Sequence, residues 1–132
     1  MLAGIQKDGE FEYCFPVRRC QGKNLLLHIS LHFLVPAVLA ILFFKKSWRL
    51  AWLIMSATMI VDVDHLLANP IYDSGRCSIG FHPMHRMWMI LFYVALCFVP
   101  RARLIGIGLT VHMLLDTIDC QVTSGVWINQ TL

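Results

Sequence analysis

Four apolar blocks constrain the fold of this chain more than any other feature of its sequence. They contain no Asp, Glu, Lys or Arg and cover residues 24–44, 50–61, 87–100 and 104–115. A helix needs about 20 apolar residues to cross a bilayer, and only the first block has that length by itself. The other three reach it only if the helix continues through polar residues at one end. The sequence therefore predicts spanning helices of which several have one polar half.

The composition favours a membrane protein. Of the 132 residues, 58% are hydrophobic and only 14% are charged, and the mean hydropathy is +0.64. A soluble chain of this length cannot bury so much apolar surface, because small domains leave a large share of their surface exposed. We therefore favour an integral membrane protein over a small soluble helical protein with an unusually apolar core.

The segments between the blocks predict how the helices connect. Residues 45–49 and 101–103 are short basic stretches that suit tight turns, and residues 69–81 carry Asn-Pro and Ser-Gly pairs typical of a loop. Short connections make consecutive helices antiparallel. The predicted fold is an all-α, integral-membrane four-helix bundle of up-down-up-down topology. Its helices are expected at residues 25–44, 50–68, 82–100 and 104–120.

These helices define the predicted domain organisation. Residues 1–24 form a polar N-terminal tail, residues 25–120 the transmembrane domain and residues 121–132 a short C-terminal tail. The N-terminal tail lacks the basic start and short apolar core of a signal peptide. In this topology both basic turns lie on one face of the membrane, and the tails and the 69–81 loop lie on the other.

Ionisable side chains from different helices are predicted to share one layer of the bundle. Each residue of an α-helix adds about 1.5 Å of rise. His32, Asp62 and Asp116 each lie 12 residues from the basic-turn end of their helix, which places all three about 18 Å above that face. Most of the other histidines, and Asp119, fall at about 22–24 Å. The layer therefore lies in the half of the bundle away from the basic turns.

The spacing of these residues indicates a metal site. Within each helix they stand three or four apart, so they share one face, and bundles build metal sites from such residues on facing helices. For any single pair the alternative is a hydrogen-bonded polar network without metal. The candidate ligands are His28, His32, Asp62, Asp64, His65, His82, His85, His112 and Asp116.

The size of this set bears on the number and kind of ions. It exceeds the four ligands of one tetrahedral ion, so we expect either two divalent ions or one ion whose ligands are held by further polar residues. Imidazole and carboxylate without thiolate suit zinc, manganese or iron. Zinc is the expected metal.

Three motifs occur in order along the chain. They are Asp62-Val-Asp-His65, the segment Arg76-Cys-Ser-Ile-Gly-Phe-His-Pro-Met-His85, and His112-x-x-x-Asp116-x-x-Asp119. This succession resembles a small, uncharacterised bacterial integral-membrane family that looks related to the membrane-bound metal-dependent hydrolases. Those hydrolases carry a histidine in the first helix, D-x-D-H after the second, a histidine pair, and H-x-x-x-D in a later helix. The matching positions are His32, Asp62, Asp64, His65, His82, His85, His112 and Asp116.

The resemblance implies a metal-dependent hydrolase. Because the cluster lies near one face of the membrane, we expect a lipid-borne ester or phosphoester as substrate. A carboxylate left free of the metal, Asp64 or Asp119, would be the general base. Arg76 and Arg86 flank the site and would hold an anionic group through paired hydrogen bonds. Snorkelling of these two side chains to the interface explains them equally well.

Two other functions remain open. One is a non-catalytic metal-binding or structural subunit of a larger membrane complex. The other is a membrane di-iron oxidoreductase, which the HxxxH and HxxH spacings suggest. Haem is disfavoured by the carboxylates. The expected partners are membrane lipid and other membrane subunits, with no nucleic acid.

The cysteines favour one orientation in the membrane. Cys14, Cys20, Cys77 and Cys120 all fall on the side of the predicted site. An even set of this kind suits an oxidising compartment, with Cys77–Cys120 and Cys14–Cys20 as the bridges. For Cys77 and Cys120 the alternative is metal ligation or burial as thiols. Lysines and arginines divide evenly between the two faces, so they do not decide the orientation of the protein in the membrane. We predict the bacterial inner membrane, with the site facing the periplasm.

Overall fold

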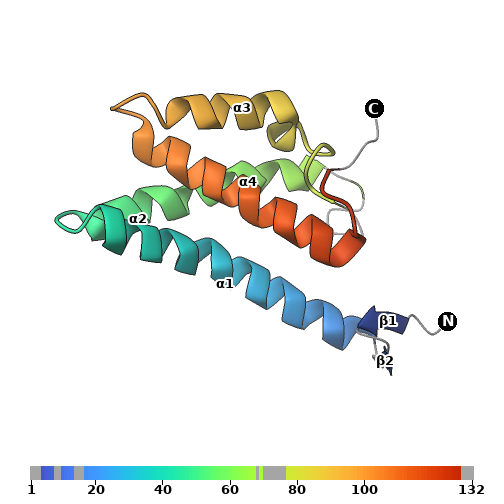
Figure 1. The fold of residues 1–132 in the computed structure, drawn as a ribbon. Coiled ribbons are helices and arrows are strands. Elements are labelled where there is room, and N and C mark those ends of the chain that lie inside the picture. The colour runs from blue at the N-terminus through green and yellow to red at the C-terminus, as the bar shows by residue number, and fades with distance from the viewer. Residues whose placement is uncertain (1–3, 8–9, 14–16, 68, 70–76, 129–132) are drawn as a thin grey trace.

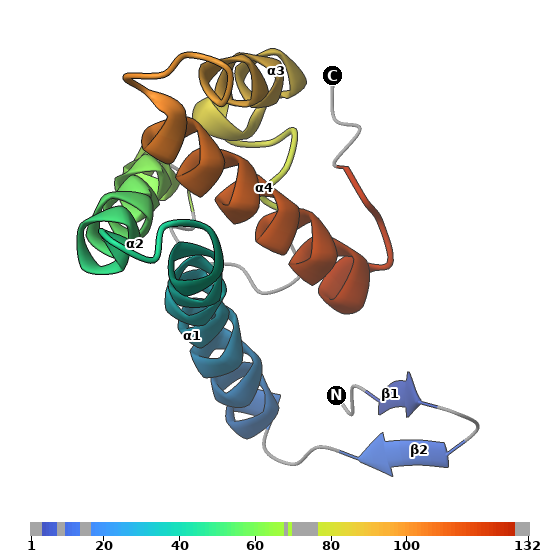
Figure 2. The same cartoon turned by 60° about the vertical axis from the view of Figure 1, so that its left-hand side comes forward.

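The computed structural model shows a helical protein with a short β-hairpin at its N-terminal end (Figures 1 and 2). The hairpin pairs β1 (Gly4–Lys7) with β2 (Glu10–Tyr13) as antiparallel strands. The predicted polar tail and all-α fold did not include these strands, because four residues are too few for a periodic signal. The structure describes residues 4–7, 10–13, 17–67, 69 and 77–128.

The first helix, α1 (Val17–Phe43), begins before the predicted start at residue 25. Pro36 lies inside it and has no N–H to donate to the carbonyl four residues earlier. The indole N–H of Trp52, on the next helix, donates to the carbonyl of Phe33 at 3.1 Å. This bond joins α2 to α1 within the turn that precedes Pro36.

The second predicted helix consists of two helical forms. Helix α2 covers Trp48–Ala57, and the chain continues as a 3₁₀ helix, η1, over Thr58–Leu67. A 3₁₀ helix has three residues per turn, so Asp62 and His65 lie on the same side of η1 and Asp64 lies on another. Yet Asp64 is the buried one of the three, whereas the side chains of Asp62 and His65 are partly exposed. Both sides of η1 therefore contribute to the site, because η1 packs against α4 and against η2.

The third predicted helix, at residues 82–100, is shorter than expected. A single 3₁₀ turn, η2 (Pro83–His85), precedes α3 (Met87–Leu96). Beyond Leu96 the backbone tightens into bonds between residues three apart, which end the helix before Pro100. The last helix, α4 (Arg103–Ser124), continues past its predicted end at residue 120. Helix α3 alone is too short to cross a bilayer.

Helix α4 packs against α1, α2, η1 and α3, as both views show (Figures 1 and 2). Two of its glycines permit this close packing on opposite sides. A Cβ at Gly106 would lie 2.6 Å from the carbonyl carbon of Leu96, and one at Gly108 would lie 2.9 Å from the Cα of Met55. Any larger residue at these positions would push α4 away from its neighbours.

Three helices in the described part of the chain are long and apolar enough to cross a membrane, namely Leu26–Phe43, Trp48–Leu67 and Arg103–Ser124. Large apolar side chains on them face outward: Phe43, Ile60 and Leu67 are 73%, 76% and 80% exposed. Several histidines and aspartates are buried instead. Apolar residues outside and polar residues inside are the arrangement that a bilayer favours.

A disulfide joins Cys77, which lies shortly before η2, to Cys120 near the end of α4. This confirms one predicted bridge and excludes the alternative that these two cysteines are metal ligands or free thiols. The disulfide ties the segment that carries His82 and His85 to α4. Cys97 is free. The other predicted bridge, Cys14–Cys20, lies outside the residues whose side chains the structure describes.

Candidate metal centre

Four segments that are distant in sequence bring their histidines and aspartates together. Helix α1 contributes two histidines, η1 contributes two aspartates and a histidine, η2 and the residue before it contribute two histidines, and α4 contributes a histidine and two aspartates. The prediction that these residues converge is confirmed. The residues that meet are His28, His32, Asp62, Asp64, His65, His82, His85, His112, Asp116 and Asp119.

The carboxylate of Asp116 lies at the centre of the cluster and is 4% exposed. Its Oδ1 lies 3.2 Å from Nε2 of His28 and 3.3 Å from Nε2 of His32. Its Oδ2 lies 3.1 Å from Nε2 of His85 and 3.5 Å from Nε2 of His112. Each oxygen of this one carboxylate therefore faces a different pair of imidazoles.

Asp62 lies beside His85 and His112, the two histidines that face Oδ2 of Asp116. Its Oδ1 lies 3.0 Å from Nε2 of His112 and 3.4 Å from Nε2 of His85. One ligand atom from each of Asp62, His85, His112 and Asp116 lies within 4.8 Å of all the others. Four nitrogen and oxygen donors gathered in this way are a donor set that suits zinc.

Asp64 supports the cluster from outside. Its Oδ2 accepts a hydrogen bond from the backbone N–H of Met84 at 2.9 Å and faces Nδ1 of His85 at 3.2 Å. A carboxylate in this position holds an imidazole by one nitrogen while the other nitrogen faces the metal. Asp64 also groups with His65 and His85 as a third potential ligand set. Its contacts fit an orienting role better than that of a base, since both of its neighbours hold it in place.

The hydrogen bonds of two buried histidines leave their metal-binding nitrogens free. Nδ1 of His32 donates to the carbonyl of His28 at 2.9 Å, and Nδ1 of His85 faces Asp64. An acceptor at Nδ1 keeps the proton there, so Nε2 carries the lone pair when the ring is neutral. Both Nε2 atoms are buried and make no hydrogen bond, yet both face Asp116. Buried nitrogens without a hydrogen bond need a ligand, and a metal ion fits them.

The charge of the cluster requires compensation. Among the described residues, the ion pairs that Asp62, Asp64 and Asp116 form all involve histidine. Although burial alone would lower it, the neighbouring carboxylates of Asp116 and Asp62 raise the pKa of His85 to about 10. Without metal, His85 therefore carries a proton that offsets the buried carboxylates. A divalent cation would supply that positive charge in its place.

His65 and His82 form one side wall of the cluster. Their rings are stacked, with centroids 3.9 Å apart, and Nε2 of His65 lies 3.1 Å from the hydroxyl of Ser78. His82 is buried but belongs to none of the three potential ligand sets among the described residues. The sequence did not single out Ser78, which had no signal beyond its position in a loop next to Cys77.

The remaining predicted site residues lie at the edge of the cluster or outside the description. Oδ1 of Asp119 is 3.6 Å from Nδ1 of His28, and the Asp119 side chain is 40% exposed. Arg86 is exposed where η2 meets α3. Arg76 lies outside the described residues, so the predicted arginine pair is not tested by the structure.

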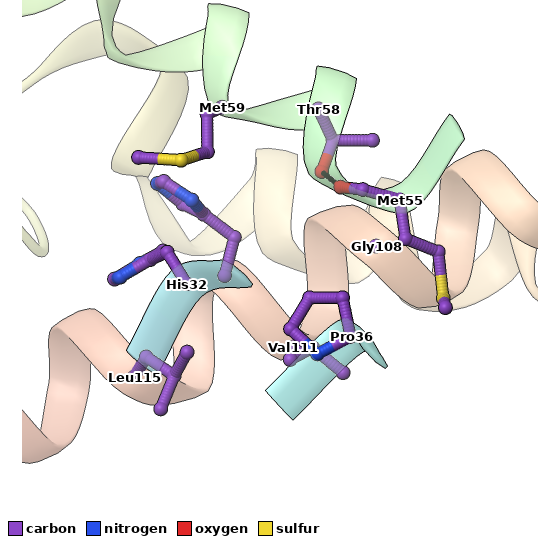
Figure 3. A pocket seen from close by; sticks show the side chains of 9 residues that line it. His32, Pro36, Met55, Thr58, Met59, Gly108, Val111 and Leu115 are labelled. Carbon is purple, nitrogen blue, oxygen red and sulfur yellow. Dashed lines mark hydrogen bonds between the residues drawn. The ribbon is translucent and has the colours of Figure 1, made fainter. Parts of the chain in front are cut away.

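A small pocket lies beside the two buried histidines His32 and His112 (Figure 3). Pro36 of α1, Met59 of η1 and Leu115 of α4 are among the other side chains that line it. Its interior has no room for a water molecule. The pocket is therefore a packing gap between α1, α2, η1 and α4 and no substrate site.

The fold and the cluster together define a helical protein with three helices able to cross a membrane and with histidine and aspartate groups able to hold metal. The chain belongs to a family of unknown function (DUF6122), whose model matches residues 23–123. No curated protein and no solved structure matches the chain. The matched range contains every residue of the cluster. The resemblance to membrane-bound metal-dependent hydrolases stays a prediction.

Proposed function

We propose that this protein is an integral membrane metal protein that hydrolyses an ester or phosphoester of a membrane lipid. The observation that carries the proposal is the pair of buried Nε2 atoms, on His32 and His85, that make no hydrogen bond and face Asp116. Each ring is held by its other nitrogen, as metal-bound histidines are. Zinc suits these donors best, with manganese and iron as the other candidates.

In the proposed membrane arrangement the helices form an up-down-up-down bundle. The turn between α1 and α2 and the turn between α3 and α4 lie at the same end of the molecule (Figure 1). These two turns carry Lys45, Lys46 and Arg101, and Arg49 and Arg103 lie at the start of α2 and α4, so this end is basic. Lysines and arginines occur toward the other end as well, so they do not decide the orientation. The proposal rests on the Cys77–Cys120 disulfide, which suits the periplasm, and places the cluster toward that face.

The proposed reaction uses the partly exposed side of the cluster. A bound divalent ion would lower the pKa of a water molecule and polarise the scissile bond. Asp119 is the better candidate for the base, because its side chain is 40% exposed while Asp64 is buried and held by Met84 and His85. The exposed guanidinium of Arg86 is the described group best able to hold an anionic headgroup.

Hydrolysis of defined lipids tests the activity. Purified, zinc-loaded protein would be mixed with vesicles or detergent micelles that contain phospholipids with labelled ester and phosphoester groups. We expect product from the wild type and at least about a hundredfold less from Asp62→Ala or His112→Ala, because removing metal ligands removes the activated water. Undiminished hydrolysis in these folded variants would contradict the proposal.

A second candidate function is a non-catalytic metal-binding subunit of a membrane complex. The pocket beside His32 and His112 is too small to admit a substrate, which favours this alternative. It predicts stoichiometric metal without hydrolysis, together with co-purification of other membrane proteins. A di-iron oxidoreductase would instead bind iron selectively and consume oxygen, and an active iron-free preparation would exclude it.

A further inference from the structure

We infer that the cluster binds two ions bridged by Asp116, an inner ion closed by protein ligands and an outer ion with an open position. This inference rests on the proposed metal centre and deepens it, because it assigns each residue to one ion. Asp62, His85, His112 and Oδ2 of Asp116 would hold the inner ion. His28, His32 and Oδ1 of Asp116 would hold the outer ion.

The two oxygens of Asp116 carry the argument for a bridge. Oδ1 faces Nε2 of both His28 and His32, at 3.2 and 3.3 Å, and Oδ2 faces Nε2 of both His85 and His112, at 3.1 and 3.5 Å. The two sets each gather within 4.8 Å and share no residue except Asp116. A single ion bound at Oδ2 would leave Nε2 of His28 and Nε2 of His32 facing the same oxygen, Oδ1 of Asp116, with no cation among the three atoms. Carboxylates that bridge in this way are typical of two-metal sites in helix bundles.

Separate contacts hold the histidines of the outer set. Nδ1 of His32 donates to the carbonyl of His28 at 2.9 Å, and Nδ1 of His28 lies 3.6 Å from Oδ1 of Asp119. The Nε2 atoms of both rings then point to Asp116. His32 is 2% exposed, and its Nε2 makes no hydrogen bond. The outer set therefore has the same construction as the inner set, in which Asp64 holds His85.

The number of ligands distinguishes the two ions. The inner set supplies four protein ligands, which closes a tetrahedral site, whereas the outer set supplies three and leaves one position open. The His28 side chain of the outer set is 24% exposed, and the Asp62 side chain of the inner set is 35% exposed. Both sets therefore reach the surface, and the open coordination position is what distinguishes the outer set. Water and an anionic substrate would bind at the outer ion, beside Asp119. Oxygen donors of a phosphoryl or carboxyl group suit that position.

Zinc stoichiometry in detergent-purified protein tests the assignment. We expect two equivalents in the wild type, one in the double variant His28→Ala/His32→Ala, and less than one in Asp116→Asn. Cys97→Ser is the control, because Cys97 is a free cysteine that belongs to neither set, and this variant should keep two. A wild type that saturates at one equivalent, or a His28→Ala/His32→Ala variant that keeps two, would overturn the bridged pair alone. No zinc in any of these proteins would overturn the metal centre as a whole.

Two spectroscopic measurements do not depend on any variant that fails to fold. Wild-type protein saturated with Mn²⁺ should give the low-temperature electron paramagnetic resonance spectrum of a spin-coupled pair. An isolated six-line Mn²⁺ signal at full occupancy would contradict the bridge. In the Co²⁺-loaded wild type, inorganic phosphate should change the visible absorption bands, because the outer ion has an open position. Unchanged bands at saturating phosphate would contradict that position.

Discussion

At the residue scale, His28, His32 and His85 each use one nitrogen for a contact within the protein and turn the other toward Asp116. His85 binds Asp64 through Nδ1 and faces Asp116 through Nε2, and His32 repeats the pattern with a backbone carbonyl. Buried polar atoms cost free energy unless they are paired. The cluster therefore suits a divalent cation, which brings more positive charge to the buried carboxylates than one bound proton does.

Asp64 is predicted to control metal affinity without binding metal. The change Asp64→Ala removes the acceptor that fixes His85, so zinc affinity should fall about 10- to 100-fold, as is usual when such a partner is lost. Asp64→Asn keeps an oxygen that can accept from Met84 and should lose less. Competition with a chromogenic zinc chelator measures both. Equal affinity in the wild type and in Asp64→Ala would show that Asp64 does not orient His85.

The metal-free protein is predicted to lose stability as the pH rises. The folded-state pKa of His85 is raised to about 10 from an unfolded value near 6.5. Its protonated form therefore stabilises the fold fully below about pH 6.5, and this contribution disappears as the pH rises through about 10. The thermal midpoint of chelator-treated protein in detergent should fall over that range. In His85→Gln, which is neutral throughout, the fall should be smaller, and an identical slope in both proteins would refute the assignment.

At the scale of the elements, the cluster depends on short helices and a tethered segment. The 3₁₀ conformation of η1 turns Asp62 toward His112 of α4 and Asp64 toward Met84 of η2. The disulfide between Cys77 and Cys120 fixes the start of the segment that leads to η2. The segment that carries His82 and His85 is therefore held at both ends, by this disulfide and by α3.

Removal of the disulfide is predicted to destabilise the protein. Its two cysteines are separated by 43 residues in the sequence, and a cross-link over a loop of that length is worth about 2–4 kcal/mol. The variant Cys77→Ser/Cys120→Ser should unfold at a lower temperature in detergent and bind zinc more weakly, because His85 is less fixed. Cys97→Ser is the control, since Cys97 is free. Equal midpoints for the double variant and Cys97→Ser would contradict the tether.

The sequence predicted which residues form the site but not how each is used. Histidines and aspartates at a common depth identified His32, Asp62 and Asp116, because that argument needs only residue type and helix rise. The inward position of Asp64 depends on the change from α- to 3₁₀-helix at Thr58, which hydrophobic spacing does not reveal. Hydrophobic spacing likewise gave no indication of where α3 ends within the apolar block at 87–100.

At the scale of the whole molecule, the account predicts the orientation of the bundle. Ser47 lies in the turn between α1 and α2, and Thr123 lies near the end of α4, and both side chains are exposed. In a Cys97→Ser background, a membrane-impermeant maleimide applied to intact bacteria should label Thr123→Cys and leave Ser47→Cys unlabelled. Labelling of both after the cells are opened is the control. The reverse pattern in intact cells would place the cluster toward the cytoplasm.

The central claim is that imidazoles and carboxylates of this cluster bind a metal ion inside the membrane domain. X-ray absorption at the zinc edge of the zinc-loaded, detergent-purified wild type tests it most directly. The account predicts nitrogen and oxygen ligands at about 2.0–2.1 Å with the outer-shell scattering of several imidazoles and no sulfur at about 2.3 Å, because Cys77 and Cys120 are held in a disulfide. Zinc bound through sulfur, or zinc that is lost on gel filtration, would contradict it.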